Sequence, residues 1–484
     1  MLDRVLPSLV VLALIALLAA CTVGPDYKTP DAPPVERFAH QPSPQDRPLA
    51  TPTADAAFWR DLGDEHLTAL IDQALGANHD IRIAMANYDR ANALLGGARF
   101  DRYPTLGAQA QARTGRSSAS QMPGAAREQR DGEQFDTRLT AVWELDFFGR
   151  VRRGIEAQRA DTEALAHDLA AVQVAIVAEL ANAYFRMRGA QAQWAMARAN
   201  ADNQRETLGL IDTLLENGRG TAFDSDRSRA QLALTEARLP PLSAEAAVLA
   251  HRIAVLSGQT PAALAETLAK PRPQAIFPGA IDPGTPGELL RRRPDIAAAE
   301  RRLHAATARI GVATADLFPR FTLGGLIGSQ ALSVGTLFGR DSEMRAVTLG
   351  IDGSFLDVGR VRARIAATDA QAAGAMANYE RAVLRAMEET ENALLRLATA
   401  HEERAALTRA AQSSERAVNV SRLQFEGGTI GVLDVLAAER TRLEADDLLA
   451  QSKAREATAL VGLYKTLAGG WPQRVPTHKT RAHR

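Results

Sequence analysis

The stretch "RRRPDIAAAERRLHAATARIGVATADLFP", residues 291–319, decides how this chain is organised. A second stretch, "GANHDIRIAMANYDRANALLGGARFDRYP" at residues 76–104, aligns with it and pairs Pro104 with Pro319. The same alignment pairs Asp80 with Asp295, Ile81 with Ile296, Ala98 with Ala313 and Tyr103 with Phe318. Similarity of this kind within one chain indicates an internal repeat.

Two further segments repeat in the same chain order. The matching pairs are "DFFGRVR" (146–152) with "LDVGRVR" (356–362), and "LLENGRGTAFDSDRSRAQ" (214–231) with "LQFEGGTIGVLDVLAAER" (423–440). The second match aligns Gly218 with Gly428 and Asp224 with Asp434. All the matches are spaced by roughly 210 residues, which chance similarity between Ala-rich helices would not produce. The sequence therefore predicts two homologous halves.

The three arginines that open residues 291–319 are not expected to bind nucleic acid. The chain balances 57 Lys and Arg against 57 Asp and Glu, and phosphate binding needs an excess of positive charge. The preceding residues predict a short helix with Thr285 as N-cap, Pro286 at its first position and Glu288 closing a capping box. Arg291–Arg293 then lie in its last turn, where cations are favourable, and Pro294 begins the next helix. We expect a structural role for these arginines; the alternative is a contact with lipid headgroups or a partner.

Residues 1–20 are predicted to be a signal peptide. The apolar run at residues 5–20 is shorter than a membrane span, and a polar, Pro-rich segment follows it. Cleavage would leave Cys21 first; it is the only cysteine, which excludes an internal disulfide. We expect Cys21 to carry the acyl chains of a bacterial lipoprotein, because several chains anchor a protein strongly where one is marginal. The alternative is an unmodified thiol.

Beyond residue 21 we find no stretch of about 18 apolar residues, so strands rather than helices are expected to cross any membrane. Segment 135–148 alternates between apolar residues such as Leu139 and charged ones such as Arg138. Three other segments alternate near the length of about 9–11 residues that a tilted membrane strand needs: 104–112, 321–329 and 347–355. A strand in a soluble sheet would show the same pattern.

Each half would supply two strands, so that one chain has four. Four strands cannot close a barrel, and an open edge facing lipid leaves backbone groups unpaired at a cost of several kcal/mol each. We therefore expect strands from several chains to share one barrel. Bacterial membrane barrels begin at about eight strands, which permits two or more copies, and three copies would make twelve strands.

Two long segments, 149–217 and 359–426, are predicted to be continuous helices because neither contains a proline. Each stretch of ~65 residues would extend on the order of 100 Å. Apolar positions in both follow an 11-residue repeat, which predicts nearly straight or slightly right-handed packing. The two series are Leu165, Leu169, Val172, Ile176, Leu180, Ala183 and Met187, and Val361, Ile365, Thr368, Ala372, Met376, Tyr379 and Val383. The alternative is an ordinary long coiled coil.

The predicted fold class is mainly α with a small β part, built from two tandem halves. An N-terminal extended segment (21–62) follows the signal peptide. Both halves then contain a helix, a strand pair, a long helix, a tip and a return helix. In the first half (63–258) the strand pair, tip and return helix are at 104–148, 217–223 and 224–257; in the second (285–468) they are at 321–356, 426–432 and 434–467. An equatorial linker (259–284) joins the halves, and a tail (469–484) follows.

These residues resemble the outer-membrane efflux factor family, the TolC-like proteins, and within it the lipoproteins of the NodT type. The resemblance rests on "CTVGPDY" (21–27), "LLRRRPDIAAAERRLHAATARIGVATADLFPRFTLGG" (289–325), "DFFGRVR" and "GGTIGVLDVLAAERTRLEA" (427–445). It implies a homotrimer with a twelve-stranded barrel in the bacterial outer membrane, continued by a periplasmic helical tunnel. It also implies a passive exit duct for drugs or other small molecules, joined through a periplasmic adaptor protein to an inner-membrane transporter of RND type.

The resemblance further implies roles for residues at the tips. Gly218, Gly220, Gly428 and Thr429 correspond to the turns that adaptor hairpins grip. Asp434 corresponds to a carboxylate that lines the closed entrance, where three copies would repel one another and favour cations. Asp224 is its equivalent in the first half; for either residue, the alternative is a solvated helix cap. The chain departs from the family pattern at Ala437, Ile430 and Phe425, where a second carboxylate, an arginine and a tyrosine can occur.

An enzyme is not expected. The sequence has no Walker loop, His-Glu-x-x-His motif, GxSxG motif or cysteine pair, and its nine histidines are scattered. Neither a metal nor a cofactor is expected, apart from covalent lipid on Cys21. Two other functions stay open: the outer-membrane component of a type I-like protein or peptide secretion system, and a non-conducting periplasmic coiled-coil tether. Conductance in planar bilayers would distinguish a duct from a tether.

Overall fold

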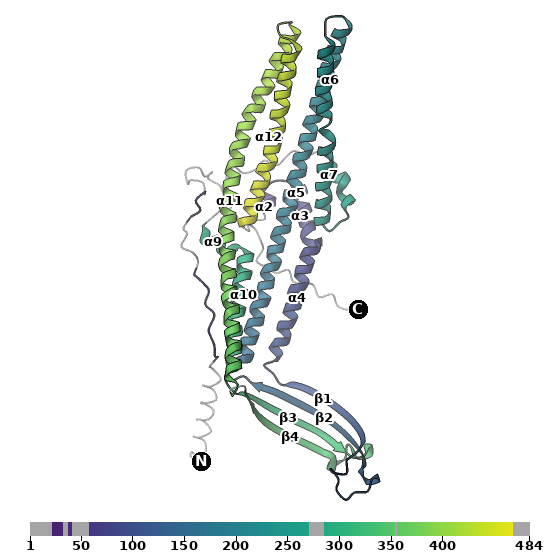
Figure 1. Ribbon diagram of the computed structural model, residues 1–484, viewed down its shortest axis with the longest axis vertical. Helices are drawn as coiled ribbons and strands as arrows, with labels where there is room; N and C mark the ends of the chain where they lie inside the picture. Colours follow the sequence, from purple (N-terminus) through teal and green to yellow (C-terminus); the bar gives the residue numbers. More distant parts are fainter. Residues whose placement is uncertain (1–21, 32–36, 41–57, 271–284, 354–355, 468–484) are drawn as a thin grey trace. The chain divides into compact units, whose positions relative to one another are not determined.

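The computed structural model describes residues 22–31, 37–40, 58–270, 285–353 and 356–467, and Figure 1 draws the others as a thin grey trace. The signal peptide, Cys21, the second part of the linker and the tail lie outside the described residues. The chain forms two compact units. The first contains residues up to 30, 87–165 and 298–380, and the second contains 31–86, 166–297 and 381–484. Each unit therefore takes segments from both sequence halves.

The first unit contains one four-stranded antiparallel sheet in the order β1-β2-β3-β4 (Figure 1). Its strands are β1 (Thr105–Arg116), β2 (Asp131–Leu145), β3 (Arg320–Ala331) and β4 (Glu343–Asp352). The four predicted strands are confirmed, and β2 pairs with β3 across the two halves. Within this chain β1 and β4 are the edges of the sheet.

The two long helices are confirmed as uninterrupted. They are α5 (Arg150–Glu216) and α11 (Val358–Glu426). All fourteen positions of the two predicted 11-residue series are buried or half-buried. The periodicity in the sequence therefore identifies the side of each helix that packs against its neighbours.

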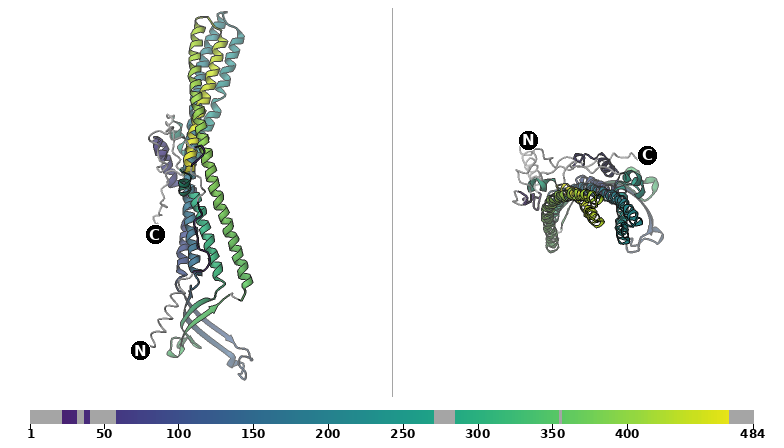
Figure 2. Two further views of the ribbon diagram at one scale, coloured as in Figure 1. Left: turned by 90° about the vertical axis from the view of Figure 1, so that its left-hand side faces the viewer. Right: turned by 90° about the horizontal axis from the view of Figure 1, so that it is seen from above.

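The remaining helices complete the two halves in the same order. The first half has α3 (Glu65–Ala77), α4 (His79–Phe100), α6 (Ala222–Glu236) and α7 (Leu239–Leu256); the second has α9 (Pro286–Arg292), α10 (Pro294–Ala315) and α12 (Val432–Leu467). A short helix, α2 (Phe58–Asp61), precedes the first half, and another, α8 (Ala265–Ala269), lies in the linker. Short 3-10 turns cover 128–130, 261–264, 334–336 and 340–342. In the second unit, α5 with α6 and α11 with α12 form two helical hairpins that lie side by side (Figures 1 and 2).

One return helix differs from the prediction. Residues 224–257 were expected to form a single helix, but the structure divides them into α6 and α7 at Ala237 and Arg238. Pro240 and Pro241 follow this break. A proline has no N–H to donate, and its ring clashes with the carbonyl four residues earlier. The other return helix, α12, contains no proline and is continuous over 36 residues.

The expectation that no helix beyond residue 21 could cross a membrane was too strict. By length and composition, the helical stretches Arg150–Glu216 and Ala222–Leu256 qualify, with 18-residue windows of mean hydropathy 1.5 and 1.2. In the first window 44% of the residues are buried, and Leu180 and Met187 of α5 belong to the main hydrophobic core. Such a window is also what the core helix of a packed protein provides.

The hydrophobic core lies mainly in the second unit. Leu67, Ile71, Leu180, Ile253 and Val461 are fully buried there. The first unit has only a small cluster among the described residues, formed by Leu95, Val151 and Ile155. The sheet of the first unit carries exposed apolar residues in addition, as the next subsection describes.

The predicted cap before the arginines is confirmed. The Thr285 side chain accepts from the Glu288 N–H, Glu288 accepts from the Thr285 N–H, and Pro286 starts α9. Arg293 is buried and pairs with Asp295 and Glu389 at 2.7 Å. Its position supports a structural role for this arginine.

Candidate channel wall and entrance turns

The sheet has one apolar face and one polar face. Because side chains alternate along a strand, the pairing register sorts them into rows. One row across all four strands is Leu106, Ala141, Gly325 and Val347, and the next row on the same face includes Trp143, Leu323 and Leu349. Rows on the opposite face include Gln109 with Arg138, and Gln111 with Asp136 and Gln330.

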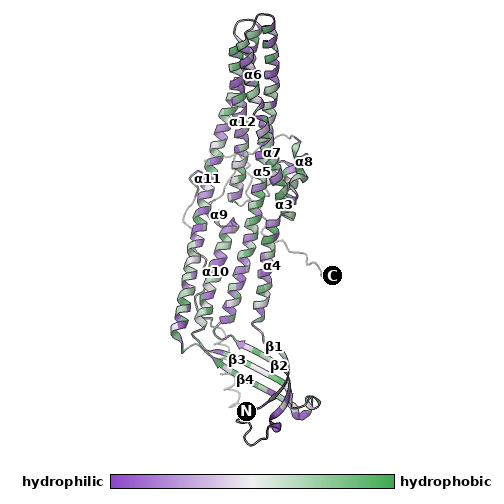
Figure 3. Ribbon diagram, turned by 45° about the vertical axis from the view of Figure 1, so that its right-hand side comes forward, coloured by the Kyte–Doolittle hydropathy of each residue, from purple (hydrophilic) through white to green (hydrophobic). Residues whose placement is uncertain are grey.

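The apolar face is open to its surroundings in this chain. Val347 is 84% exposed, Leu106 80% and Ile327 60%, and hydrophobic residues recur along the strands in Figure 3. Soluble monomers rarely leave a continuous apolar patch of this extent uncovered. With the polar groups gathered on the other face, the sheet has the two-faced character of a membrane barrel wall.

Aromatic side chains gather where the strands join the helices. Phe147 meets Phe321 edge-on at 5.2 Å, and Phe148 stacks on Phe318 at 4.5 Å between ring centroids. Trp143 donates from Nε1 to the carbonyl oxygen of Arg102 at 2.9 Å. Girdles of aromatic residues mark the interfacial ends of membrane strands, and this group lies at one end of the sheet.

Residues 22–30, which we call the N-terminal segment, are fixed to the same end of the first unit. The N–H of Val23 donates to the carbonyl oxygen of Phe148 at 3.2 Å. Gly24, at φ +88°, lies so close to α10 that an added Cβ would be 2.4 Å from the Cα of Gly311. The segment therefore begins beside the aromatic group, directly after Cys21.

Two side chains hold the N-terminal segment by polar contacts. Asp26 accepts from Nη2 of the buried Arg153 at 2.5 Å. Tyr27 stacks on His304 at 4.3 Å and donates to Glu300. Burial, followed by the hydrogen bond to Glu300, raises the pKa of Tyr27, so the hydroxyl keeps its proton and remains a donor.

The two hairpin turns of the second unit share the same pair of backbone hydrogen bonds. Gly218 and Gly428 adopt φ +68° and +74°. In the first turn the Gly218 and Arg219 N–H groups donate to Leu215 and Leu214; in the second, Gly428 and Thr429 donate to Phe425 and Gln424. Both are Schellman motifs, which satisfy the last carbonyl groups of a helix and favour glycine at the left-handed position.

The predicted tip residues have different local reasons for their identity. Gly220 is required by space, since an added Cβ would lie 2.9 Å from the backbone nitrogen of Leu215. Thr429 Oγ1 donates to the carbonyl oxygen of Gln424 at 2.9 Å, which adds a side-chain bond to its turn. Ile430, at the place equivalent to Gly220, is half-buried.

The two candidate gate carboxylates contact the residues that directly precede α6 and α12. Asp434 is exposed and accepts from the Gly431 N–H at 3.3 Å. Asp224 accepts from Thr221 Oγ1 at 2.6 Å, and its N–H donates back to that hydroxyl at 3.2 Å. Both residues lie in the first turn of a helix, where a carboxylate is favourable. Their capping contacts leave a pore-lining role for Asp434 as a hypothesis.

The two hairpins contain equivalent ion pairs with the charges exchanged, which was not predicted from the sequence. Asp212 of α5 pairs with Arg229 of α6 at 3.5 Å. At the equivalent positions, 210 residues later, Arg422 of α11 pairs with Glu439 of α12 at 2.7 Å. Applying the repeat spacing to charged residues, in addition to glycines, would have found this pattern.

Glu439 also connects the two hairpins. It is 8% exposed, and its Oε1 accepts from Arg422 and, at 3.4 Å, from Thr207 Oγ1 of α5. Farther from the turns, Arg238 at the start of α7 pairs with Asp447 of α12. These polar contacts join the two hairpins of the second unit.

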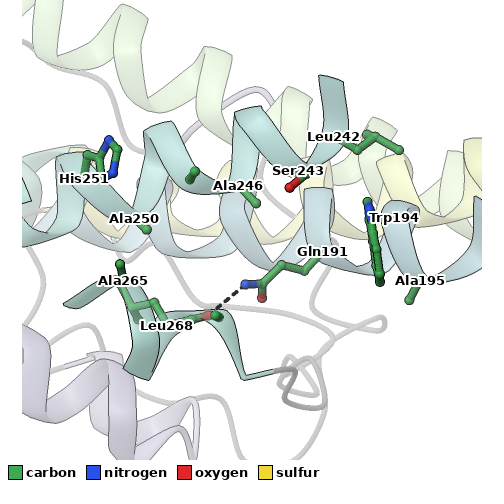
Figure 4. A pocket seen from close by; sticks show the side chains of 12 residues that line it. Gln191, Trp194, Ala195, Leu242, Ser243, Ala246, Ala250, His251, Ala265 and Leu268 are labelled. Atoms are coloured by element: carbon green, nitrogen blue, oxygen red, sulfur yellow. Dashed lines mark hydrogen bonds between the residues drawn. The ribbon is translucent and has the colours of Figure 1, made fainter. Parts of the chain in front are cut away.

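An apolar cavity of about 330 Å³ lies between α5, α7 and α8. Gln191 closes one side by donating from Nε2 to the carbonyl oxygen of Leu268 at 2.8 Å, shown as a dashed line in Figure 4. Trp194, Leu242 and His251 also line it. No pattern in the sequence indicates this cavity, because three separate elements form it. Within the described ranges, no group of His, Cys, Asp or Glu side chains could hold a metal ion.

Comparison with known proteins agrees with this arrangement. The outer membrane efflux protein family matches residues 70–259 and 285–469, one match in each half. The outer membrane protein OprJ of Pseudomonas aeruginosa is 31% identical over 463 residues, 95% of both chains, and Nodulation protein T of Rhizobium leguminosarum bv. trifolii is 29% identical over 88% of this chain and 89% of that protein.

A solved structure shows the same fold. The outer-membrane channel OprN is 39% identical and superposes with a TM-score of 0.87, covering 94% of this chain and 100% of that one. The predicted fold class and the predicted resemblance are both confirmed. The chain therefore belongs to the outer membrane efflux protein family, whose members are efflux channels of the outer membrane.

Proposed function

We propose that this chain forms a homotrimeric duct, in which three four-stranded sheets close a twelve-stranded barrel. The observation that carries this is the sheet itself, which has one exposed apolar face and two edges, β1 and β4, without partners within the described chain. Since β1 and β4 run in opposite directions, β4 of one copy can pair antiparallel with β1 of the next. Closure satisfies every edge, which lipid requires.

In this arrangement the apolar face contacts lipid and the polar face, with Gln109, Gln111 and Arg138, surrounds water. Thr22, which follows Cys21 in the sequence, packs against Gly149. Acyl chains on Cys21 would enter the bilayer beside the aromatic group around Phe148. This location supports lipidation of Cys21.

The duct is proposed to serve a tripartite pump. The turns at Gly218 and Gly220 and at Gly428 and Thr429 would bind the helical hairpins of a periplasmic adaptor, which connects the duct to an inner-membrane transporter of RND type. Asp434 would line the entrance, with Asp224 as a weaker candidate. Passive conduction needs no catalytic group or cofactor other than the lipid.

The proposed duct can be tested by measuring its oligomeric state and its conductance. Purified protein should run as a trimer in cross-linking and should produce conductance steps in planar bilayers. Pairing of β4 with a neighbouring β1 predicts a specific cross-link. Cysteines introduced at Thr348 and Gln109, which lie on these edges and on the same face of the sheet, should give subunit cross-links more readily than cysteines at Thr348 and Thr140 of the central β2. A monomer without conductance would rule out the duct.

A further inference from the structure

A second cavity lies in the first unit, between α5, α10 and α11, and it is lined by charge. Its volume is about 530 Å³, within the range of about 300–1,000 Å³ that small-molecule sites occupy. Four arginines and two aspartates line it: Arg150, Arg309, Arg320, Arg364, Asp161 and Asp316.

One carboxylate in this cavity is shared by two arginines. Asp316 is 6% exposed; its Oδ1 accepts from Arg320 and its Oδ2 from Arg364, both at 2.5 Å. Each guanidinium carries five N–H donors, and these bonds use one nitrogen of each. The pair therefore keeps one net positive charge and donors for another anion.

The remaining charges are balanced one for one. Arg309 pairs with Asp161, and Arg150 pairs with Glu144 at the end of β2. Counting Glu144, four arginines face three carboxylates, so the excess is 4 − 3 = 1 cation per chain. That excess is located at Asp316, where the side chains of Arg320 and Arg364 are 41% and 53% exposed.

The cavity lies on the side of the polar face of the sheet. Arg320 is two residues before Thr322, which pairs with Glu144 on that face. On α10, His304 contacts Tyr27 of the N-terminal segment. Arg309 is five residues later, so its side chain points about 140° away from His304 around the helix axis. In the proposed barrel the cavity would therefore open to the water-filled interior, not to lipid.

We propose that this cavity binds the anionic group of solutes passing through the duct, a carboxylate, sulfonate or phosphate held by Arg320 and Arg364. Planar guanidinium groups bind such anions by paired hydrogen bonds. The inference concerns this chain's cargo and rests on the proposed duct for its access route. Transient binding at the base of the barrel would favour anionic over uncharged molecules of equal size.

Binding can be measured without conduction, by equilibrium dialysis of 1,5-naphthalenedisulfonate against purified full-length protein in detergent. Arg364→Gln should weaken binding about tenfold, the effect of losing one charge-assisted hydrogen bond. Arg364→Lys keeps the charge but not the planar group, and should weaken it less. The matched control is Arg362→Gln, which removes an exposed arginine two residues away that does not line the cavity.

Equal affinity of the wild type and Arg364→Gln would overturn the site. Should Arg364→Gln not assemble, Arg320→Gln at the start of β3 provides the second test, and unchanged affinity there would have the same meaning. Binding that is weakened in Arg364→Gln and kept in Arg362→Gln supports the site, whatever the conductance. Absence of conductance in bilayers would reject the proposed duct and leave the binding site supported.

Discussion

Asn78 and Arg293 have equivalent roles in the two halves. Asn78 donates from Nδ2 to the carbonyl oxygen of Leu256 at 2.9 Å, and Arg293 donates from Nη1 to that of Thr466 at 3.3 Å. Both side chains are buried, and each lies between two consecutive helices, α3 and α4 or α9 and α10. A buried donor at each break satisfies the last carbonyl groups of the return helix.

Arg293→Met should destabilise the protein by about 1–3 kcal/mol, because it removes bonds to a buried carbonyl and to two carboxylates that are half exposed and partly screened. Thermal unfolding followed by circular dichroism measures the loss. The control is Arg291→Ala, on an exposed side chain in the last turn of α9, which should change stability by less than about 0.5 kcal/mol. Equal effects of both variants would contradict the structural role of Arg293.

The reversed ion pairs predict a charge-exchange experiment. Glu439→Arg alone places a second cation beside Arg422 and removes the contact between Glu439 and Thr207, so the second hairpin should lose stability. Adding Arg422→Glu should restore about 1 kcal/mol, a modest value because Arg422 is 37% exposed. Hydrogen exchange of α11 and α12 reports this hairpin directly.

The exposed pair Arg440 and Glu444, 69% and 59% exposed, is the control for charge exchange. Exchanging those charges should leave hydrogen exchange unchanged. If the double variant at Arg422 and Glu439 were no more protected than Glu439→Arg, the pair would have no coupling. The reversal of sign between the hairpins would then be unrelated to stability.

The backbone at Gly428 predicts a position-specific effect within one turn. Gly428→Ala forces a side chain into φ +74° and should cost about 1–2 kcal/mol. Gly427→Ala is the matched control, since Gly427 does not have a positive φ and an added Cβ would be 3.4 Å from its nearest neighbour. Protease cleavage at the turn should increase only in Gly428→Ala; cleavage of both variants at the same rate would refute the assignment.

The sequence predicted the long helices and the strands because their signals are local. The absence of proline between residues 149 and 217 and the alternation in 135–148 needed no tertiary information. The break at Arg238 also has a local signal, because Pro240 and Pro241 follow it in the sequence. The prediction of one continuous helix over 224–257 did not take these prolines into account. The cavities could not be predicted, because Gln191 and Leu268, or Arg320 and Arg364, meet only after separate elements pack.

Tyr184 predicts how stability depends on alkaline pH. Burial, and then its hydrogen bond to Asp64 at 2.7 Å, raises the pKa of Tyr184 to about 12. The unfolded chain, with a tyrosine pKa of about 10, binds fewer protons than the folded chain between these values. Stability should therefore fall as pH rises from about 10 to about 12.

Tyr184→Phe should be less stable at neutral pH by about 1 kcal/mol, for the lost hydrogen bond, but should show a shallower decline between pH 10 and 12. Urea unfolding at several pH values measures both effects. Tyr103→Phe, on a 63% exposed side chain, is the control and should keep the wild-type slope. A wild-type slope in Tyr184→Phe would show that other groups cause the decline.

Asp434 can be tested while its contact at the start of α12 is kept. It is the third residue of this helix, and the side-chain oxygen of Asn can accept from the Gly431 N–H as the carboxylate does, so Asp434→Asn keeps this contact and removes the charge. If three copies surround the entrance of the proposed duct, the ratio of potassium to chloride permeability in planar bilayers should fall by a factor of about five, the effect of about 1 kcal/mol. Asp226→Asn, on a 78% exposed side chain of the other hairpin, should leave the ratio unchanged. An unchanged ratio in Asp434→Asn would leave Asp434 with only its capping role, because the wild-type selectivity would then arise elsewhere in the wall.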